Sequence, residues 1–186
     1  MEFDKVIKKR ASIRNYSLKK PKPEEIIELI GAANTAPSPG NLEIVRFIII
    51  EDKGKIHQLA QCCQQKFVSD APYVVAICSY PQRVKRMYDK RTEKYIQHHV
   101  GAVVENFLLK ATDIGLASCW VGAFTPETKD ILKIPEDINL EVILPIGYPE
   151  KINKTKQKPK HSLNNRVFFE SYGNKYQKPF RSSHPG

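Results

Sequence analysis

The stretch "KYIQHHVGAVVENFLLKATDIG", residues 94–115, decides the class of fold that this chain of 186 residues adopts. Its apolar side chains do not lie on one narrow stripe of a helix; they are Tyr95, Ile96, Val100, Val103, Val104, Phe107, Leu108, Leu109 and Ile114. A helix that is apolar over most of its circumference has to be covered on several sides. We therefore predict the central helix of the core, whose remaining apolar surface is either buried within one chain or joins a dimer interface.

Helical and strand-like patterns alternate around this helix. The helical patterns cover residues 2–9, 23–34, 54–66, 93–115 and 126–133. The strand-like runs cover 45–50, 73–79, 118–122 and 140–148. Apolar periodicity and turn residues separate the two kinds of element, so the chain is expected to form one α+β or α/β domain.

Composition limits the compartment and the chemistry. No apolar run approaches the ~18 residues of a membrane span, and the N-terminus lacks the apolar core of a secretory signal, so we expect a cytoplasmic protein with no membrane partner. The four cysteines show no C-x-x-C spacing, which argues against zinc. His98 and His99 are neighbours that point about 100° apart on a helix, so we interpret them as surface histidines and expect no metal site.

Charge is concentrated at the two ends of the chain. The net charge is +6 over residues 1–22 and +8 over 151–186, whereas residues 23–150 carry −4. The acidic middle and the lack of a nucleic-acid-binding motif argue against a nucleic-acid partner. The basic ends are either solvated tails or, if they meet in the fold, one phosphate pocket.

The stretch "RASIRNYS", residues 10–17, suggests what such a pocket would contain. In a helix Arg10 and Arg14 would share a side and Ser12 would point away, but an extended chain places all three on one face. The extended conformation would make a three-pronged anion clamp.

The stretch "TAPSPGNLEIVRF", residues 35–47, predicts an irregular turn between a helix and a strand. Pro37, Pro39 and Gly40 break regular structure, and Ser38 and Asn41 supply short hydrogen-bonding groups. An ordinary connection would explain these residues as well as a ligand-binding loop would.

Taken together, five segments resemble the nitroreductase family of flavin enzymes in order and spacing. They are "RASIRNYS", "AANTAPSPGNLEIVRF", "DAPYVVAIC", "HHVGAVVENFLLKATDIGLASCWVGAF" and "ILPIGYPE", and the resemblance covers about residues 5–170. It implies an α+β, three-layer fold with a mixed, mainly antiparallel sheet flanked by helices, and a homodimer with FMN at its interface. Residues 1–173 would form the single domain and 174–186 a C-terminal tail.

The resemblance also implies roles for individual residues. Arg10 would lie at the FMN phosphate, Ser12 at the phosphate or ribityl chain, and Arg14 near the pyrimidine edge of the ring. The turn from the other subunit would cover the flavin through Pro37, Ser38, Pro39 and Asn41. Gly122 and Ala123 would bring their backbone close to N5. Lys160, with His161 and Arg166 as further matches, would complete the phosphate site.

The implied reaction is a ping-pong transfer of a hydride from NAD(P)H through flavin N5 to a small acceptor such as a nitroaromatic or a quinone. No side chain is expected to act as a covalent nucleophile. Alternatives on the same scaffold are dehalogenation, dehydrogenation or breakdown of the flavin, and a non-catalytic flavin-binding protein is the alternative from another class. Three residues depart from the family pattern: Glu43 stands where an amide is common, His99 where an aspartate is common, and Lys160 where an arginine is usual. The acceptor and the preferred nicotinamide cofactor are not identified by the sequence.

Overall fold

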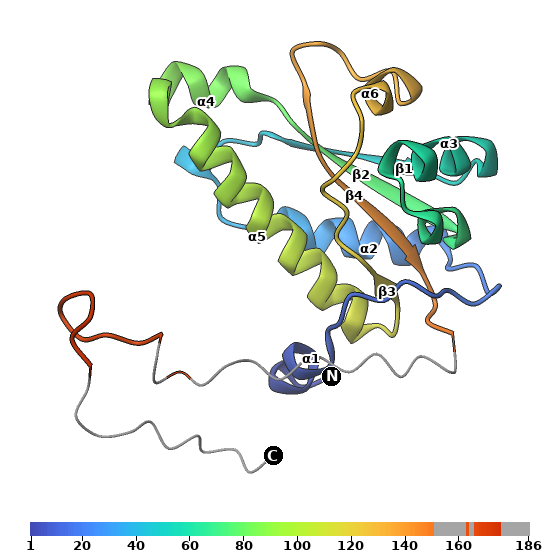
Figure 1. The fold of residues 1–186 in the computed structure, drawn as a ribbon, viewed down its shortest axis with the longest axis horizontal. Helices are drawn as coiled ribbons and strands as arrows, with labels where there is room; N and C mark the ends of the chain where they lie inside the picture. Colours follow the sequence, from blue (N-terminus) through green and yellow to red (C-terminus); the bar gives the residue numbers. More distant parts are fainter. Residues whose placement is uncertain (151–162, 164–165, 176–186) are drawn as a thin grey trace.

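The computed structural model describes residues 1–150, 163 and 166–175 (Figure 1). The elements follow in the order α1 (Phe3–Lys9), α2 (Pro23–Asn34), the 3-10 turn η1 (Pro39–Asn41), β1 (Val45–Ile50), α3 (Lys53–Cys63), η2 (Lys66–Asp70), β2 (Tyr73–Ser79), α4 (Pro81–Tyr88), η3 (Asp89–Arg91), α5 (Thr92–Asp113), β3 (Ala117–Ser118), α6 (Glu127–Ile131) and β4 (Asn139–Gly147). Figure 1 shows α5 running the length of the sheet on one side.

The sheet has the strand order β1-β2-β4-β3, and its neighbouring strands are antiparallel. One parallel bridge, between Ser12 and Ser118, joins the N-terminal segment to β3. The predicted mixed, mainly antiparallel sheet is therefore confirmed. Strand β2 lies between β1 and β4 and is buried along its whole length.

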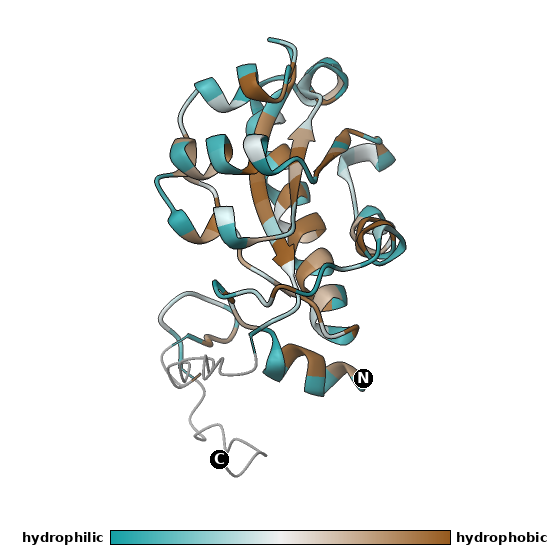
Figure 2. Ribbon diagram, turned by 90° about the vertical axis from the view of Figure 1, so that its right-hand side faces the viewer, coloured by the Kyte–Doolittle hydropathy of each residue, from teal (hydrophilic) through white to brown (hydrophobic). Residues whose placement is uncertain are grey.

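The two faces of the sheet are covered by different helices, because successive side chains of a strand point to opposite faces. Val75 and Ile77 of β2 belong to the larger apolar cluster, which includes α2 and α5. Val74 and Ala76 belong to the second cluster, which includes α3 and residues next to it. Apolar strands thus lie between two layers of helices (Figure 2), and the three-layer fold is confirmed.

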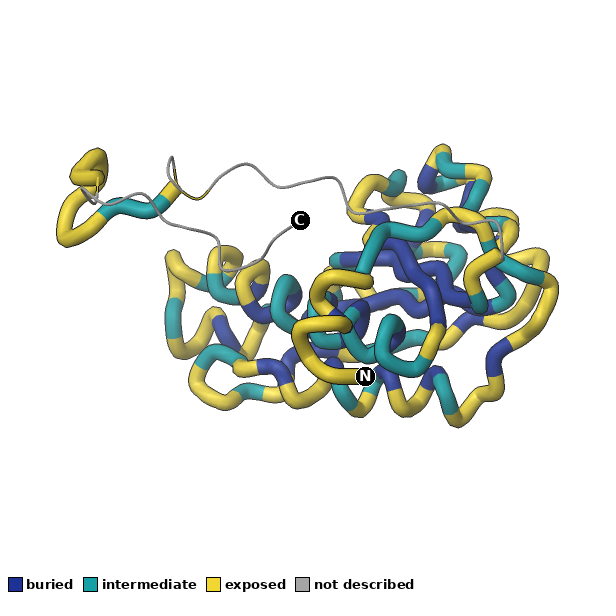
Figure 3. The backbone as a smooth tube through the Cα atoms, turned by 90° about the horizontal axis from the view of Figure 1, so that it is seen from below, coloured by how far each residue is buried: buried dark blue, intermediate teal, exposed yellow. Residues whose placement is uncertain are grey.

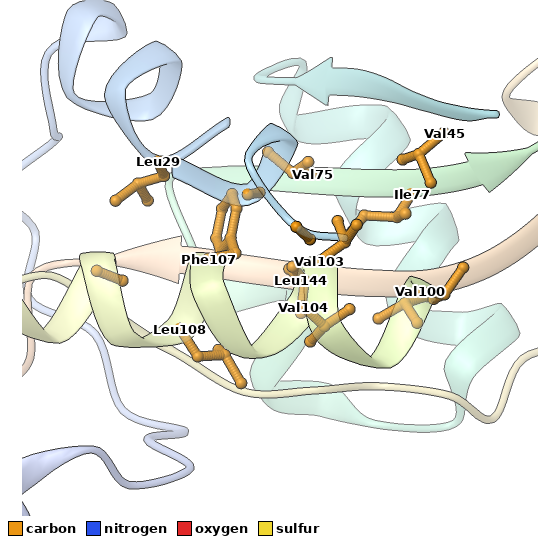
Figure 4. Packing of buried hydrophobic residues seen from close by; sticks show 14 of the residues in the cluster. Leu29, Val45, Val75, Ile77, Val100, Val103, Val104, Phe107, Leu108 and Leu144 are labelled. Atoms are coloured by element: carbon orange, nitrogen blue, oxygen red, sulfur yellow. The ribbon is translucent and has the colours of Figure 1, made fainter. Parts of the chain in front are cut away.

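Helix α5 occupies the core as predicted. Its buried side chains include Val100, Val103, Val104 and Phe107, which face β2 and β4 in Figure 4. Phe107 is fully buried and packs near Leu29 of α2. The tube drawn by burial shows the same buried interior between exposed outer turns (Figure 3). Most of the apolar surface of α5 is therefore covered within one chain.

Local signals set several helix ends. Pro23 occupies the first turn of α2, and Glu25 accepts a hydrogen bond of 2.8 Å from the backbone N–H of Lys22. Asp52 caps α3 by accepting from the Lys55 N–H at 2.8 Å. Helix α3 ends before Gln64, which adopts a left-handed conformation with φ of 52°.

Two elements differ from the sequence-based expectation. Helix α4 was not predicted, because its sequence "PQRVKRMY" is rich in charge and buries only Val84. The predicted strand 118–122 is reduced to the two residues of β3, after which Val121 forms an isolated bridge to Ile143. Helix α4 packs against α5, and the short β3 pairs with the end of β4.

Across the described residues, none of the helices has both the length and the apolar composition needed to cross a membrane. Residues 176–186 of the predicted tail 174–186 lie outside the described residues. The domain limit at residue 173 therefore stays a prediction.

Candidate functional site

The segment with both arginines is extended and lies beside β3. Ser12 forms the parallel bridge to Ser118, and the Ile13 N–H donates a hydrogen bond of 3.0 Å to the Ser118 carbonyl oxygen. The Tyr16 hydroxyl then donates to the carbonyl oxygens of Ile13 and Pro145 at 3.0 and 3.3 Å. The segment is extended, as expected, and is fixed to the end of β4. That Arg10, Ser12 and Arg14 together clamp an anion stays a prediction.

Arg10 points toward α5. Its Nε lies 3.2 Å from Oε1 of Glu105, and 23% of its side chain is exposed. Arg10 also lines a cleft of about 410 Å³ together with Lys9 and Ser118. The hydroxyl of Ser118 is buried and has no hydrogen-bond partner among the described residues. A buried polar group without a partner calls for an explanation, such as a ligand or water.

Arg14 contacts η2 and not α5. Its guanidinium group is 5.5 Å from the centre of the Phe67 ring in η2, a cation–π distance. Arg10 and Arg14 thus share the extended segment, but they contact different elements. Glu105 and Phe67 could not be identified from the sequence as neighbours of the arginines, because both contacts join residues far apart in the chain.

Burial shapes the electrostatics of the groups near Arg14. Desolvation raises the pKa of the Cys119 thiol, while the Arg14 charge and a hydrogen bond with Ser12 act in the opposite direction. Desolvation also raises the pKa of Tyr16, with a smaller contribution from Cys119. Both groups therefore stay neutral near pH 7, and the arginines supply the positive charge of this region.

Gly122 and Ala123 follow directly after the Val121 bridge and are both exposed. A Cβ atom added at Gly122 would meet one atom within 4 Å, the Trp120 Nε1 at 3.7 Å, which is ordinary contact. The folded chain itself therefore does not require glycine at this position. An open backbone here leaves room for a flat group beside the 120–123 segment.

The predicted turn lies at another part of α5. His99 Nδ1 is 2.8 Å from the Pro37 carbonyl oxygen, so Nδ1 carries the proton because a carbonyl only accepts. Gly40 and Asn41 adopt positive φ values of 58° and 55°, which confirms the irregular turn. The interpretation of His99 as a surface residue was wrong, since only 7% of it is exposed, whereas His98 is exposed.

The structure thus separates the predicted site residues into two groups within one chain. Arg10, Ser12 and Arg14 lie beside the segment that leads to Gly122 and Ala123. The residues of the turn lie around the first half of α5, where they line other cavities. They are Pro37, Ser38, Pro39 and Asn41, together with Glu43. That the turn covers a flavin of a second subunit stays a prediction.

Lys160 and His161 lie outside the described residues, and Arg166 is exposed. In the described part of the chain, no three His, Cys, Asp or Glu side chains gather closely enough to hold a metal ion.

Comparisons with known proteins agree with the fold. The family model described as "Nitroreductase family" matches residues 7–148. A "Putative NADH dehydrogenase/NAD(P)H nitroreductase" of Archaeoglobus fulgidus is 30% identical over 152 residues, covering 78% of this chain and 84% of the relative. An "Iodotyrosine deiodinase" of Thermotoga neapolitana is 27% identical and covers 84% of this chain and 91% of the relative. The solved NADPH:FMN oxidoreductase of Vibrio harveyi, complexed with NAD+, superimposes with a TM-score of 0.81 at 22% identity, over 91% of this chain and 77% of that one.

Proposed function

The chain belongs to the nitroreductase family, and we propose that it is an FMN-dependent oxidoreductase that uses NAD(P)H to reduce a small acceptor such as a nitroaromatic or a quinone. One observation carries the proposal. The segment with Arg10, Ser12 and Arg14 lies beside the strand that leads to the open backbone at Gly122. The chain therefore offers cations for a phosphate and space for a flat ring on neighbouring segments.

The residues present fit FMN by their chemistry. Guanidinium groups are permanently charged and bind phosphate through paired hydrogen bonds, which suits Arg10. The buried Ser118 hydroxyl lacks a partner among the described residues, which is consistent with a polar ligand close by. The unhindered Gly122 backbone would accept a ring that a larger side chain would push away.

When bound, FMN supplies the hydride transfer itself, taking two electrons from NAD(P)H and passing them to the acceptor. For a nitroaromatic, one hydride and one proton would convert the nitro group to a nitroso group, with one of its oxygens leaving as water. Arg10 would hold the phosphate, and Ser12 would support the same end of the cofactor. Arg14 would supply a positive charge that favours the reduced, negatively charged form of the ring. Gly122 and Ala123 leave the reacting edge accessible.

We further propose that the active form is a homodimer in which the turn at Pro37–Asn41 of one subunit covers the flavin held by the other. The separation of the turn from the arginine segment within one chain supports this arrangement, because the two groups line different cavities. The hydrogen bond from His99 would hold the turn in position.

Reductive dehalogenation is a second candidate, because relatives named iodotyrosine deiodinase align with most of this chain. Release of iodide from 3-iodotyrosine in the presence of reductant, at a rate above that of nitroaromatic reduction, would favour this second function.

The first prediction concerns FMN binding and uses the single tryptophan of the chain as the reporter. Trp120 is 43% exposed and lies two residues before Gly122, so bound flavin should quench its fluorescence. Arg10→Ala should weaken FMN binding, because one charge-assisted phosphate contact contributes roughly 1.5–3 kcal/mol, or about 10-fold to 150-fold in the dissociation constant.

Glu105→Gln is the matched control, since it removes the carboxylate that faces Arg10 but leaves the arginine in place. This variant should bind FMN as tightly as the wild type or more tightly. Equal affinity in Arg10→Ala and wild type would contradict the phosphate role. Anaerobic addition of NAD(P)H should bleach the flavin absorbance, and a spectrum that does not change would indicate a flavin-binding protein rather than an oxidoreductase.

A further inference from the structure

A cavity of about 360 Å³ lies between the Pro37–Asn41 turn, the end of α4 and the first half of α5. Its lining is mainly aromatic and apolar, and consists of Pro37, Pro39, Tyr88, Tyr95, His98, His99 and Ala102. Small-molecule sites commonly occupy about 300–1,000 Å³ and combine apolar walls with a few polar groups. This cavity has the size and character of a site for one aromatic ring with its substituents.

The walls of the cavity are held by specific contacts. The Tyr88 and Tyr95 rings pack edge to face, with centroids 4.9 Å apart at 81°. The end of α4 lies so close to the turn that a Cβ at Gly40 would be 2.9 Å from the Tyr88 hydroxyl. One turn after Tyr95 on α5, His99 donates a hydrogen bond to the Pro37 carbonyl oxygen. Two aromatic walls arranged in this way favour a planar ring.

An arginine packs against two of the tyrosines that line the cavity. The Arg91 guanidinium group lies 5.6 Å from the Tyr95 ring centre and 6.0 Å from that of Tyr88. The neighbouring stretch of chain, residues 81–94, is rich in exposed cations, namely Arg83, Lys85, Arg86, Lys90 and Lys94, against the two acids Asp89 and Glu93. Such an excess of positive charge beside an apolar cavity favours ligands that are negatively charged.

We infer that this cavity binds the electron acceptor, that the acceptor is a planar aromatic molecule bearing a negative charge, and that Arg91 determines the preference for that charge. The inference rests on the proposed function, in which the adjoining turn covers the flavin of the second subunit. Helix α4 and η3 then provide selectivity, while the flavin region provides the chemistry.

The test compares two nitroaromatics of similar shape, 4-nitrobenzoate and its neutral analogue 4-nitrobenzamide. Dissociation constants are measured by calorimetry on the oxidised, flavin-loaded protein without NAD(P)H, and kcat/KM is measured separately. The wild type should bind the benzoate about fivefold more tightly than the benzamide, the scale of one partly solvated charge contact. Arg91→Gln should abolish that difference, and Arg91→Lys should retain most of it.

Lys55→Gln is the control for net charge, because it removes an exposed cation on α3, in the layer that packs with the second apolar cluster. It should keep the preference of the wild type. Tyr95→Leu should weaken both ligands alike, because the ring contacts the aromatic part that they share. Equal affinities of the wild type for the two ligands, or an unchanged preference in Arg91→Gln, would overturn the inference.

The flavin spectrum of the same samples reports on the proposed function separately. If the protein binds flavin that NAD(P)H bleaches but shows no preference for the benzoate, this inference is overturned and the proposed function stands. A protein that binds no flavin overturns the proposed function and, with it, the role of the cavity as an acceptor site.

Discussion

At the scale of single residues, the buried thiols show how folding changes an ionisation. Cys63 and Cys78 are buried, and desolvation raises the pKa of each thiol from 9.0 to about 11. The unfolded chain therefore loses these protons at a lower pH than the folded chain does. Because the folded pKa is raised, the stabilisation is complete below about pH 9 and is lost as the pH rises toward 11.

We therefore predict that the free energy of unfolding falls between about pH 9 and pH 11, as measured by urea denaturation under reducing conditions. The double variant Cys63→Ala, Cys78→Ala should show a smaller fall over the same interval, although its stability at pH 8 is lower. Lysines and tyrosines on the surface are common to the wild type and the variant. The difference between their plots of unfolding free energy against pH therefore reports the two thiols. Parallel plots would contradict the raised thiol pKa values.

At the same scale, His99 makes a contact that an aspartate could not make, because an ionised carboxylate only accepts hydrogen bonds. The family resemblance leads us to expect an aspartate at this position. Here a buried imidazole donates to the Pro37 carbonyl oxygen at 2.8 Å. One residue of α5 thus links the core helix to the turn that we propose covers the flavin.

At the scale of secondary-structure elements, the end of β4 is tightly fitted to its neighbours. A Cβ at Gly147 would lie 2.8 Å from Cδ of Pro72 and 3.1 Å from Cδ1 of Tyr16. Neither ring can easily move away, because the proline ring is rigid and the tyrosine is held by its hydroxyl. By contrast, a Cβ at Gly31, on the exposed side of α2, would meet no atom within 4 Å.

We predict opposite effects for the same substitution at these two glycines. Gly147→Ala should lower the free energy of unfolding by roughly 1–3 kcal/mol, the range for overpacking. Gly31→Ala should raise it by about 0.5–1 kcal/mol, because alanine is the better helix former. Chemical denaturation of both variants beside the wild type measures each effect. A neutral Gly147→Ala would show that the strand end can shift.

At the scale of the whole molecule, apolar side chains remain exposed on α1. Phe3 and Ile7 are four residues apart on one side of the helix and are 68% and 43% exposed. Helix α1 itself packs against the core helix α5. Figure 2 shows the same apolar colouring on the helix near the N-terminus. Such a surface is expected to be covered in an assembly.

We predict that the flavin-loaded protein sediments at low micromolar concentration as a species of twice the chain mass of 21.3 kDa. Phe3→Asp should shift the equilibrium toward the single chain, because a carboxylate would be buried at the contact. Leu18→Asp is the control, since Leu18 is fully exposed and isolated leucines on a surface are ordinary. A single chain that retains its flavin and full activity would contradict the dimer.

The sequence by itself determined the elements whose signals are local. The limits of α2, β1 and β2 agree with the predicted ranges 23–34, 45–50 and 73–79. Apolar periodicity and capping residues act within a few positions along the chain, so they can be read without a structure. For the segment with Arg10, Ser12 and Arg14 the local pattern was compatible with a helix or an extended chain, and the structure shows the extended one.

Only the tertiary structure decided which of these elements meet. It paired Arg10 with Glu105, placed Arg14 over Phe67, and separated the turn at Pro37 from the arginine segment. It also formed α4, whose charged sequence has little apolar pattern, and so brought Tyr88 to the aromatic cavity. These contacts join residues tens of positions apart, and their energies depend on distances and burial that no local pattern along the chain contains.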